Sequence, residues 1–151
     1  MANYLDLESN AVVANGVAPV LGDTSGGDVD GTTVDLLNYR YCTFVGSVGT
    51  EGDTYSGSVY HEFNVEESAD DSSWTDVAAA DLTTSVTSIS TVTGCFGLVD
   101  AAAEAPGVFV TTYIGSSRYV RGVTVAGGTH TNGTPLSLVS IKHGAKILPA
   151  A

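Results

Sequence analysis

The chain has 151 residues, of which 43% are hydrophobic and 15% are charged, and this length suits one domain with a sizeable core. Its formal net charge of −12, from 17 acidic and five basic residues, argues against a nucleic-acid partner, because binding to phosphates needs clustered Lys and Arg. The 18 glycines and the many Ser, Thr and Val residues indicate strands and turns rather than helices.

The first residues, MANYLDLESNAVV, carry no basic region and no long apolar run. We therefore expect neither a signal peptide nor a membrane span. Without an export signal, Cys42 and Cys95 should stay reduced in a cytosol. Both lie in apolar, strand-like surroundings, so we interpret them as buried small hydrophobic side chains rather than as a disulfide or a metal pair.

Residues 1–33 are rich in Gly, Asp and Thr and show no sustained hydrophobic period. They predict an extended N-terminal arm, and residues 34–151 predict a single β-sandwich domain. Within the arm, DVDG at 28–31 resembles the start of a calcium-binding EF-hand loop. Its twelfth position is Tyr39 rather than an acid, so we discard a calcium loop here.

From residue 34 onward the apolar residues begin to alternate. The stretch YRYCTFVGSV (39–48) is apolar in both phases and predicts a central strand. Residues 54–68 give the clearest strand, with His61 and Phe63 in the phase expected to face the core and Glu62 in the phase expected to face solvent.

The next segments are less regular. Residues 81–100 are β-branched but lose a single phase, which predicts a bulge or two short strands. VDAAAEAPG (99–107) is compatible with a helical turn ended by Pro106 and with an extended loop. Further strands are predicted over 107–115, 118–127, 135–144 and 145–148.

This order of short strands, separated by frequent turns and lacking helices of crossover length, predicts the fold class. We expect an all-β protein with an antiparallel two-sheet β-sandwich, of the jelly-roll or immunoglobulin-like kind, and an extended N-terminal arm.

The stretch VEESADDSSWTDV (65–77) places five carboxylates around one tryptophan. It could be a calcium cage, a pair of catalytic acids or a solvated turn. Glu66 and Glu67 should point to opposite faces of a strand, and Asp70 and Asp71 occupy positions where turns favour Asp. We therefore interpret the stretch as a solvated hairpin turn.

Histidines and catalytic motifs give little support for chemistry. His61 falls in the core phase and is interpreted as a buried, hydrogen-bonded side chain, whereas His130 and His143 lie in turn-like contexts without metal-ligand spacing. The sequence has no G-x-S-x-G, phosphate-binding loop, C-x-x-C or H-E-x-x-H motif. We expect no enzymatic activity, no cofactor and no metal.

Charge is distributed unevenly along the chain. Residues 1–104 hold all 17 acids, whereas the residues after them hold four of the five basic side chains. Either the last third contacts an acidic partner, or strands from both parts interleave so that the charges mix in space. Arg118 and Arg121 leave the same alternatives open, since each could bind a partner's carboxylate or form an internal salt bridge to the acid-rich strand at 60–67.

Two motifs resemble a pattern in small head proteins of tailed bacteriophages. FNVEESADDSSWTDV (63–77) fits an acidic turn of the form E-S-x-D-[DGS]-x-x-W-x-D-V, and YIGSSRYVRGVTV (113–125) fits a later strand of the form [YV]-x-G-x-x-R-Y-V-R. The stretch VDLLNYRYCTFVGSVG (34–49) is also similar to this group. The resemblance covers residues 32–148.

The resemblance implies a capsid decoration, or cement, protein that sits on the outer surface of the virion head. Such a protein is a homo-oligomer, with a trimer favoured over a dimer, and it clamps subunits of the major capsid protein after assembly in the bacterial host cytoplasm. It contacts neither nucleic acid nor membrane directly. The residues that match the motifs are read as fold determinants first: Trp74, Arg118, Tyr119 and Arg121.

We expect partner binding through the arm and one end or face of the sandwich. The candidate partner-binding residues are Asn3, Tyr4, Leu5, Val12, Val13, Arg118 and Arg121. The alternative function is a glycan-binding module of a phage tail or surface structure, in which Trp74, Tyr60 or Tyr113 would stack on sugar rings. A third interpretation is an adhesion module stabilised by Ca²⁺.

Overall fold

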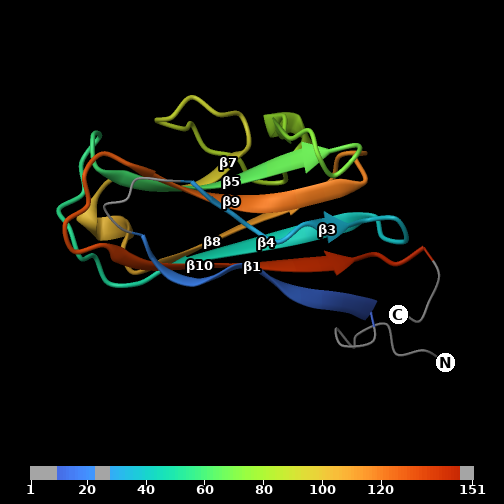
Figure 1. The fold of residues 1–151 in the computed structure, drawn as a ribbon, viewed down its shortest axis with the longest axis horizontal. Helices are drawn as coiled ribbons and strands as arrows, with labels where there is room; N and C mark the ends of the chain where they lie inside the picture. The colour runs from blue at the N-terminus through green and yellow to red at the C-terminus, as the bar shows by residue number, and fades with distance from the viewer. Residues whose placement is uncertain (1–9, 23–27, 147–151) are drawn as a thin grey trace.

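A computed structural model describes residues 10–22 and 28–146 of the chain. These residues form two antiparallel sheets that pack face to face (Figure 1), and of the residues described only Asn10 is α-helical. The predicted fold class, an all-β two-sheet sandwich, is confirmed. The helical turn before Pro106 is present as the 3-10 turn η2 (Ala102–Glu104), and a second short turn, η1, spans Ala79–Asp81.

The four-stranded sheet forms the lower layer in Figure 1 and has the order β1-β10-β4-β8. Its strands are β1 (Ala11–Gly22), β10 (Thr134–His143), β4 (Tyr41–Val48) and β8 (Gly107–Tyr113). β4 lies between two neighbours, as predicted for a central strand.

The six-stranded sheet forms the upper layer, and β9 and β5 are its long central strands. Its strands are β2 (Val29–Asp30), β3 (Val34–Asp35), β9 (Tyr119–Gly127), β5 (Tyr60–Ser68), β6 (Thr75–Asp76) and β7 (Cys95–Val99). The predicted strand over 145–148 is not seen at Ala145 and Lys146, and its last two residues lie outside the described part of the chain.

The strands pair in a nested order. β1 pairs with β10, β2 and β3 pair with β9, β4 pairs with β8, and β5 pairs with β7. This is the pattern of one long hairpin whose two halves wind together around a core, which is the connectivity of a jelly roll. The structure therefore has the first of the two predicted sandwich topologies.

Strand β1 falls within the extended N-terminal arm expected over residues 1–33, and it is part of the sandwich. It pairs with β10 from end to end and buries Val17 to 4% exposure. Two register shifts, between Asn15 and Val17 and between Val17 and Val20, change which side chains face the core, so no single alternation runs through this sequence. Residues 1–9 and 23–27 of the expected arm lie outside the described residues.

The core between the sheets is aromatic. Its largest fully buried side chains include Tyr113, Phe44, Phe63, Phe96 and Leu138. The ring of Phe63 lies 6.0 Å from that of Phe96, and a Cβ added at Gly46 would come within 2.7 Å of the Phe63 ring. Close packing of this kind makes the core sensitive to changes in side-chain volume.

Both cysteines are buried, Cys42 in the core between the sheets and Cys95 opposite Asn64 in the β5–β7 register. Cys42 and Cys95 are fully buried and free, which confirms their interpretation as small hydrophobic side chains. Burial raises the pKa of each thiol to about 12, because a thiolate is poorly solvated there.

The outer side of β5 is covered rather than wet. Within the stretch 81–100, residues 83–94 form a loop above β5 and β7 (Figure 1). The expected bulge lies in β7, where Phe96 is the extra residue between the partners of Phe63 and Asn64. Because the loop covers this side, Glu62 is 0% and Asn64 only 3% exposed. The prediction that Glu62 faces solvent is therefore wrong, because it considered the alternation of the strand without a covering loop.

Replacing Leu138 with Ala should lower the free energy of unfolding by about 2–5 kcal/mol, because the removed atoms leave a cavity in a fully buried site. Leu37 is 56% exposed, and Leu37→Ala is the matched control, expected to change stability by no more than about 0.5 kcal/mol. Urea unfolding of both variants measures the difference. Equal effects would contradict the assignment of Leu138 to the core.

Candidate interaction surfaces

The acidic stretch at 65–77 is a turn between β5 and β6. The carboxylate of Asp70 accepts hydrogen bonds from the backbone N–H of Ser73 at 2.8 Å and of Ser72 at 3.0 Å, and from the hydroxyl of Ser68 at 3.0 Å. These donors hold the pKa of Asp70 well below its usual range. Asp71 has a φ of 59°, a conformation that Asp tolerates in turns. The interpretation as a hairpin turn is confirmed.

Arg121 joins the two motifs of the sequence. It lies directly opposite Glu66 in the β5–β9 register, and its Nε donates to Glu66 Oε2 at 2.7 Å. Its Nη1 lies 2.8 Å from Asp30 Oδ2, and its guanidinium carbon lies 4.4 Å from the ring centroid of Trp74. The Arg121 side chain is only 17% exposed, so the internal salt bridge is the alternative that the structure shows.

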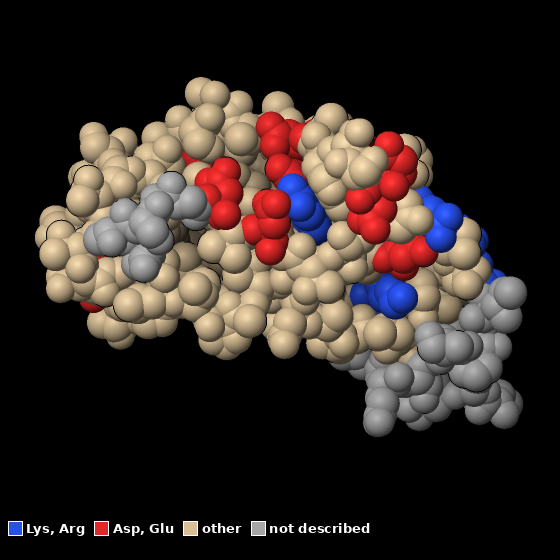
Figure 2. Space-filling view, in the orientation of Figure 1, with Lys and Arg blue, Asp and Glu red and all other residues tan. Residues whose placement is uncertain are grey.

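Arg118, the residue before β9, makes a bidentate pair with Asp35 of β3. Its Nε and Nη2 donate to the two carboxylate oxygens at 3.0 and 2.7 Å, and the hydrogen bond from Arg118 lowers the pKa of Asp35. Both arginines after residue 104 thus pair with acids before it. The interpretation that strands from both parts interleave and mix their charges is confirmed, and Figure 2 shows blue atoms beside red ones over the upper layer.

Glu67 points to the side of β5 opposite Glu66, as expected. Its carboxylate accepts a hydrogen bond from the hydroxyl of Tyr113, and the backbone N–H of Ser117 donates to the same hydroxyl oxygen at 2.9 Å. Burial, together with the hydrogen bond to Glu67, raises the pKa of Tyr113 to about 12. Because Tyr113 is 0% exposed, it cannot stack on a sugar ring.

Glu62 fastens the loop 83–94 to the sheet. Its carboxylate accepts hydrogen bonds from the backbone N–H groups of Ile89 at 2.6 Å and Ser90 at 3.2 Å. The hydroxyls of Ser88 and Ser90 donate to it as well. A buried carboxylate needs such donors to replace water, so this residue has a structural role.

His61 and His130 form a buried stack. Their ring centroids are 4.2 Å apart with planes at 20°, and both residues are 0% exposed. The interpretation of His61 as a buried side chain is therefore confirmed. Burial and the nearby His130 lower the pKa of His61 to about 4.

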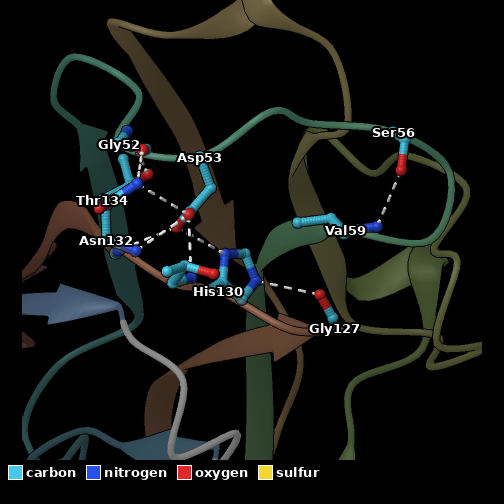
Figure 3. Close-up of polar contacts among 10 residues, drawn as sticks. Gly52, Asp53, Ser56, Val59, Gly127, His130, Asn132 and Thr134 are labelled. Atoms are coloured by element: carbon cyan, nitrogen blue, oxygen red, sulfur yellow. Dashed lines mark hydrogen bonds and ion pairs between the residues drawn. The ribbon is translucent and has the colours of Figure 1, made fainter.

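Asp53 clamps two loops together beside this stack (Figure 3). The backbone N–H of Asn132, together with those of Thr131 and Gly133, donates to its carboxylate at 2.8–2.9 Å, and these bonds lower its pKa. The Asn132 amide donates to the carbonyl of Gly52 at 2.9 Å. The carboxylate oxygens are therefore occupied by the turn that they stabilise.

The strands of the four-stranded sheet are almost free of charge. Lys142 is the only Asp, Glu, Lys or Arg in β1, β4, β8 and β10, all of which the structure describes in full. It shares the phase of the buried Cys42, which it faces in the register, and its Nζ lies 4.6 Å from the ring centroid of Tyr39. The outer side of this sheet therefore carries no formal charge.

We call this outer side the uncharged face. Its register places these residues on it: Val13, Asn15, Tyr41, Thr43, Val45, Ser47, Val108, Val110, Thr112, Ser137, Val139, Ile141 and His143. Val13, Val108 and Val110 are 59%, 65% and 49% exposed. In Figure 2 the charged atoms lie mostly over the upper layer, and most of the lower layer is tan.

Three polar side chains of the uncharged face bond to one another. Thr43 Oγ1 lies 2.8 Å from Thr112 Oγ1 and 2.9 Å from His143 Nε2. Burial lowers the pKa of His143, so its ring is neutral at pH 7. A partner that covers this face displaces water from valines and from hydroxyls that already have partners, and this limits the cost of desolvation.

The candidate partner-binding residues fall into three groups. Asn3, Tyr4 and Leu5 lie outside the described residues. Val12 packs against the core, whereas Val13 lies on the uncharged face. Arg118 and Arg121 are engaged in internal ion pairs.

The structure brings together residues that the sequence analysis did not select, namely the outward valines of β4, β8 and β10. The available signal was the lack of charge in those segments. It could be used only once the sheet order was known.

Among residues 10–22 and 28–146, no group of three or more His, Cys, Asp or Glu side chains could hold a metal ion. No helix in the same residues is long and apolar enough to cross a membrane. Comparison of the chain with family models, curated proteins and solved structures finds no match.

Glu62→Gln should free the loop 83–94, because an amide presents its own N–H groups to donors and leaves some of them unpaired. We expect a loss of about 1–3 kcal/mol in unfolding free energy and faster hydrogen exchange at the amides of Ile89 and Ser90. The exposed Glu51 provides the control, Glu51→Gln, which should change neither quantity. Unchanged hydrogen exchange in Glu62→Gln would contradict the role of Glu62 in holding the loop 83–94.

Stability should depend on pH through His61. The unfolded chain takes up a proton near pH 6.5, whereas the folded chain does so near pH 4. The contribution is therefore complete above pH 6.5, decreases as the pH falls and levels off below about 4, with a total loss of roughly 3 kcal/mol. His143 acts in the same direction, so the difference between wild type and His61→Phe isolates His61. Parallel stability curves for these two proteins would show that His61 does not titrate as described.

Proposed function

We propose that this protein is a structural protein of a tailed-phage virion that decorates the outer surface of the head. The uncharged face is the observation that carries this proposal. In a chain with a net charge of −12, one whole face of the sandwich lacks charge and exposes β-branched side chains. Depletion of charge together with exposed apolar side chains is typical of protein–protein interfaces.

The dimensions of the face suit docking to a shell. Four strands spaced about 4.8 Å apart, each with about seven residues at about 3.4 Å, cover about 450 Å². This is within the size range of the largest functional patches on monomers, about 300–600 Å². A contact of this size is modest by itself, and many copies on a lattice of major capsid subunits would add interface area that must be lost before neighbouring subunits separate.

The distribution of charge supports an orientation on the shell. Carboxylates from β2, β3 and β5 lie on the other layer, where Arg118 and Arg121 offset only some of them. With the uncharged face against capsid subunits, this acidic layer faces solvent and keeps the surface hydrated. The protein then acts as a non-enzymatic homo-oligomer on the outside of the head, with a trimer favoured.

The resemblance of the two motifs to phage head proteins supports the same proposal. Their matching residues meet at one corner, where Arg121 contacts both Trp74 and Glu66. This arrangement stabilises the fold. A partner would therefore bind to another part of the surface.

The glycan-binding alternative has less support. Trp74 is covered on one side by the guanidinium of Arg121, and Tyr113 is buried. The ring of Tyr60 lies against Gly127, where an added Cβ would approach it to 2.1 Å. Each of the three rings therefore packs against other residues of the protein, which disfavours stacking on a sugar.

Val110→Asp tests the proposal, because a carboxylate at this exposed position of β8 on the uncharged face would be desolvated on docking. Co-sedimentation with purified heads that lack the protein should show binding weakened by at least about tenfold. Val86→Asp, at a residue that is 40% exposed on the loop 83–94, is the matched control and should bind like wild type. Both variants should keep the wild-type melting temperature.

Unchanged head binding by a folded Val110→Asp protein would contradict docking through this face. Failure of the wild-type protein to bind any head preparation, including heads of its own phage, would contradict the proposed function itself.

A further inference from the structure

Strand β8 forms one edge of the four-stranded sheet, and β1 forms the other (Figure 1). One half of the β8 edge is covered. The backbone N–H of Thr83 donates to the carbonyl of Thr112 at 3.0 Å, and its hydroxyl accepts from the Thr112 N–H at 2.9 Å. The backbone N–H of Ile114 donates to the carbonyl of Asp81 at 2.9 Å. The backbone groups of Thr112 therefore point away from β4, and those of the other even-numbered residues of β8 do the same.

The other half of this edge is open at Val108 and Val110. The covering segment leaves the edge at Thr84, whose backbone bonds to the hydroxyl of Thr111, a side chain on the inner side of β8 that is only 1% exposed. Within the described part of the chain, no residue bonds to the outward N–H and C=O groups of Val108 or Val110. Four backbone groups along this half therefore have no partner in the chain.

The chain that leads into β8 leaves this half open. A Cβ added at Gly107 would come within 2.5 Å of the carbonyl oxygen of Glu104, the last residue of η2. Side chains at position 107 share the direction of Phe109, which packs against the core. The end of η2 therefore lies on the inner side of β8 rather than beside Val108 in the plane of the sheet.

Strand β8 lacks the features that protect edge strands from pairing with another chain, which are charges, prolines and bulges. Its sequence, GVFVTTY, has no charged residue and no proline, and its pairing with β4 has no register shift. Val108 and Val110 are 65% and 49% exposed, and valine favours strands. The opposite edge, β1, has two register shifts. The β8 edge is therefore the side of this sheet to which a further strand can be added.

This edge is complementary to itself. When two copies lie antiparallel with Val108 of one opposite Val110 of the other, the twofold arrangement forms two such pairs. Each pair exchanges two N–H···O=C hydrogen bonds, so the four outward groups of each copy all find partners. Phe109 then lies opposite the same residue of the second copy. Because β8 has no formal charge, the two chains meet where their net negative charges oppose association least.

The neighbouring registers are worse. A shift that places Val108 opposite Val108 of the second copy brings Val110 opposite Pro106, which has no N–H to donate. A shift that places Val110 opposite Val110 brings Val108 opposite Thr112, whose outward groups are already bonded to Thr83. Only the pairing of Val108 with Val110 uses all of the open groups.

We propose that two copies of this protein associate through their β8 edges, with Val108 of each copy opposite Val110 of the other. The two four-stranded sheets then form one eight-stranded sheet. Directly opposite residues point to the same side of a sheet, so the two uncharged faces become one surface of roughly 900 Å². The contact uses backbone groups in the plane of the sheet, and the valine side chains stay open to a further partner.

A twofold contact closes with two copies. The β8 edge therefore gives a dimer rather than the trimer that the resemblance to phage head proteins favours. The inference concerns the chain alone and does not depend on binding to a phage head.

Disulfide trapping with two cysteine variants of the full-length protein tests this register. Opposite residues of a hydrogen-bonded pair have Cα atoms about 5.5 Å apart, within the range of about 4.4–6.8 Å that a disulfide spans. A mixture of Val108→Cys and Val110→Cys should form a linked dimer under mild oxidation at least about tenfold faster than either variant alone, because identical positions are offset by two residues and lie about 8 Å apart. Cys42 and Cys95 are buried and should not compete.

Val13→Cys is the matched control, since Val13 is 59% exposed on the other edge strand. Its mixture with Val110→Cys should link no faster than either variant alone. Equal rates in the mixture of Val108→Cys with Val110→Cys and in the separate variants would overturn the proposal, and so would faster linkage of Val110→Cys to itself. Linkage of these cysteines to a head subunit, with none between copies, would show that the edge binds a strand of another protein and would also overturn it.

Sedimentation equilibrium of the unlinked protein provides a second measurement, at an ionic strength of about 0.5 M that screens the repulsion between two acidic chains. Val108→Pro removes one outward N–H from each copy, and an edge strand tolerates proline where the N–H faces solvent. The loss of two of the four hydrogen bonds should weaken dimerisation by at least about tenfold. Val108→Thr keeps the N–H and the β-branched shape and should associate like wild type. Wild-type protein that stays monomeric up to about 1 mM, or equal association of the two variants, would contradict the proposed dimer.

Discussion

The nested pairing of the two ends of the chain is the constraint on which the rest of the structure depends. β1 pairs with β10, and β2 and β3 pair with β9, so residues more than eighty positions apart must meet before either sheet is complete. This explains why the uneven charge along the sequence does not become an uneven charge in space. Arg121 reaches Glu66 across one strand pair, and Arg118 reaches Asp35 across another.

The same pairing divides the polar chemistry between the two layers. Strands of the four-stranded sheet carry one charged residue, Lys142, whereas β5 alone carries three glutamates. Each of those glutamates has specific donors: the loop 83–94 for Glu62, Arg121 for Glu66 and Tyr113 for Glu67. The carboxylates that suggested chemistry in the sequence serve to fix loops and strands, and the surface best suited to a partner is one without any of them.

Much of the fold could be predicted from the sequence, because the segment of β5 alternates, that of β4 is apolar in both phases, and glycine-bearing turns mark off β8, β9 and β10. The strand β1 was not predicted because its register shifts hide the alternation. The burial of Glu62 was not predicted because the covering loop is rich in β-branched residues and resembles strands in sequence. The uncharged face lay beyond sequence reasoning for a different reason. Valines at 13, 45, 110 and 139 become neighbours only when four distant segments are placed side by side.

The irregular pairing of β1 has a consequence for how copies of the protein can meet. A regular outer strand offers a ladder of unpaired backbone groups on which another molecule can continue the sheet, and such growth has no natural end. The two shifts in β1 interrupt that ladder near its middle. The backbone hydrogen-bonding groups of an added strand would therefore be out of register with those of β1. Growth of the four-stranded sheet by addition of a further strand at this edge is thereby disfavoured.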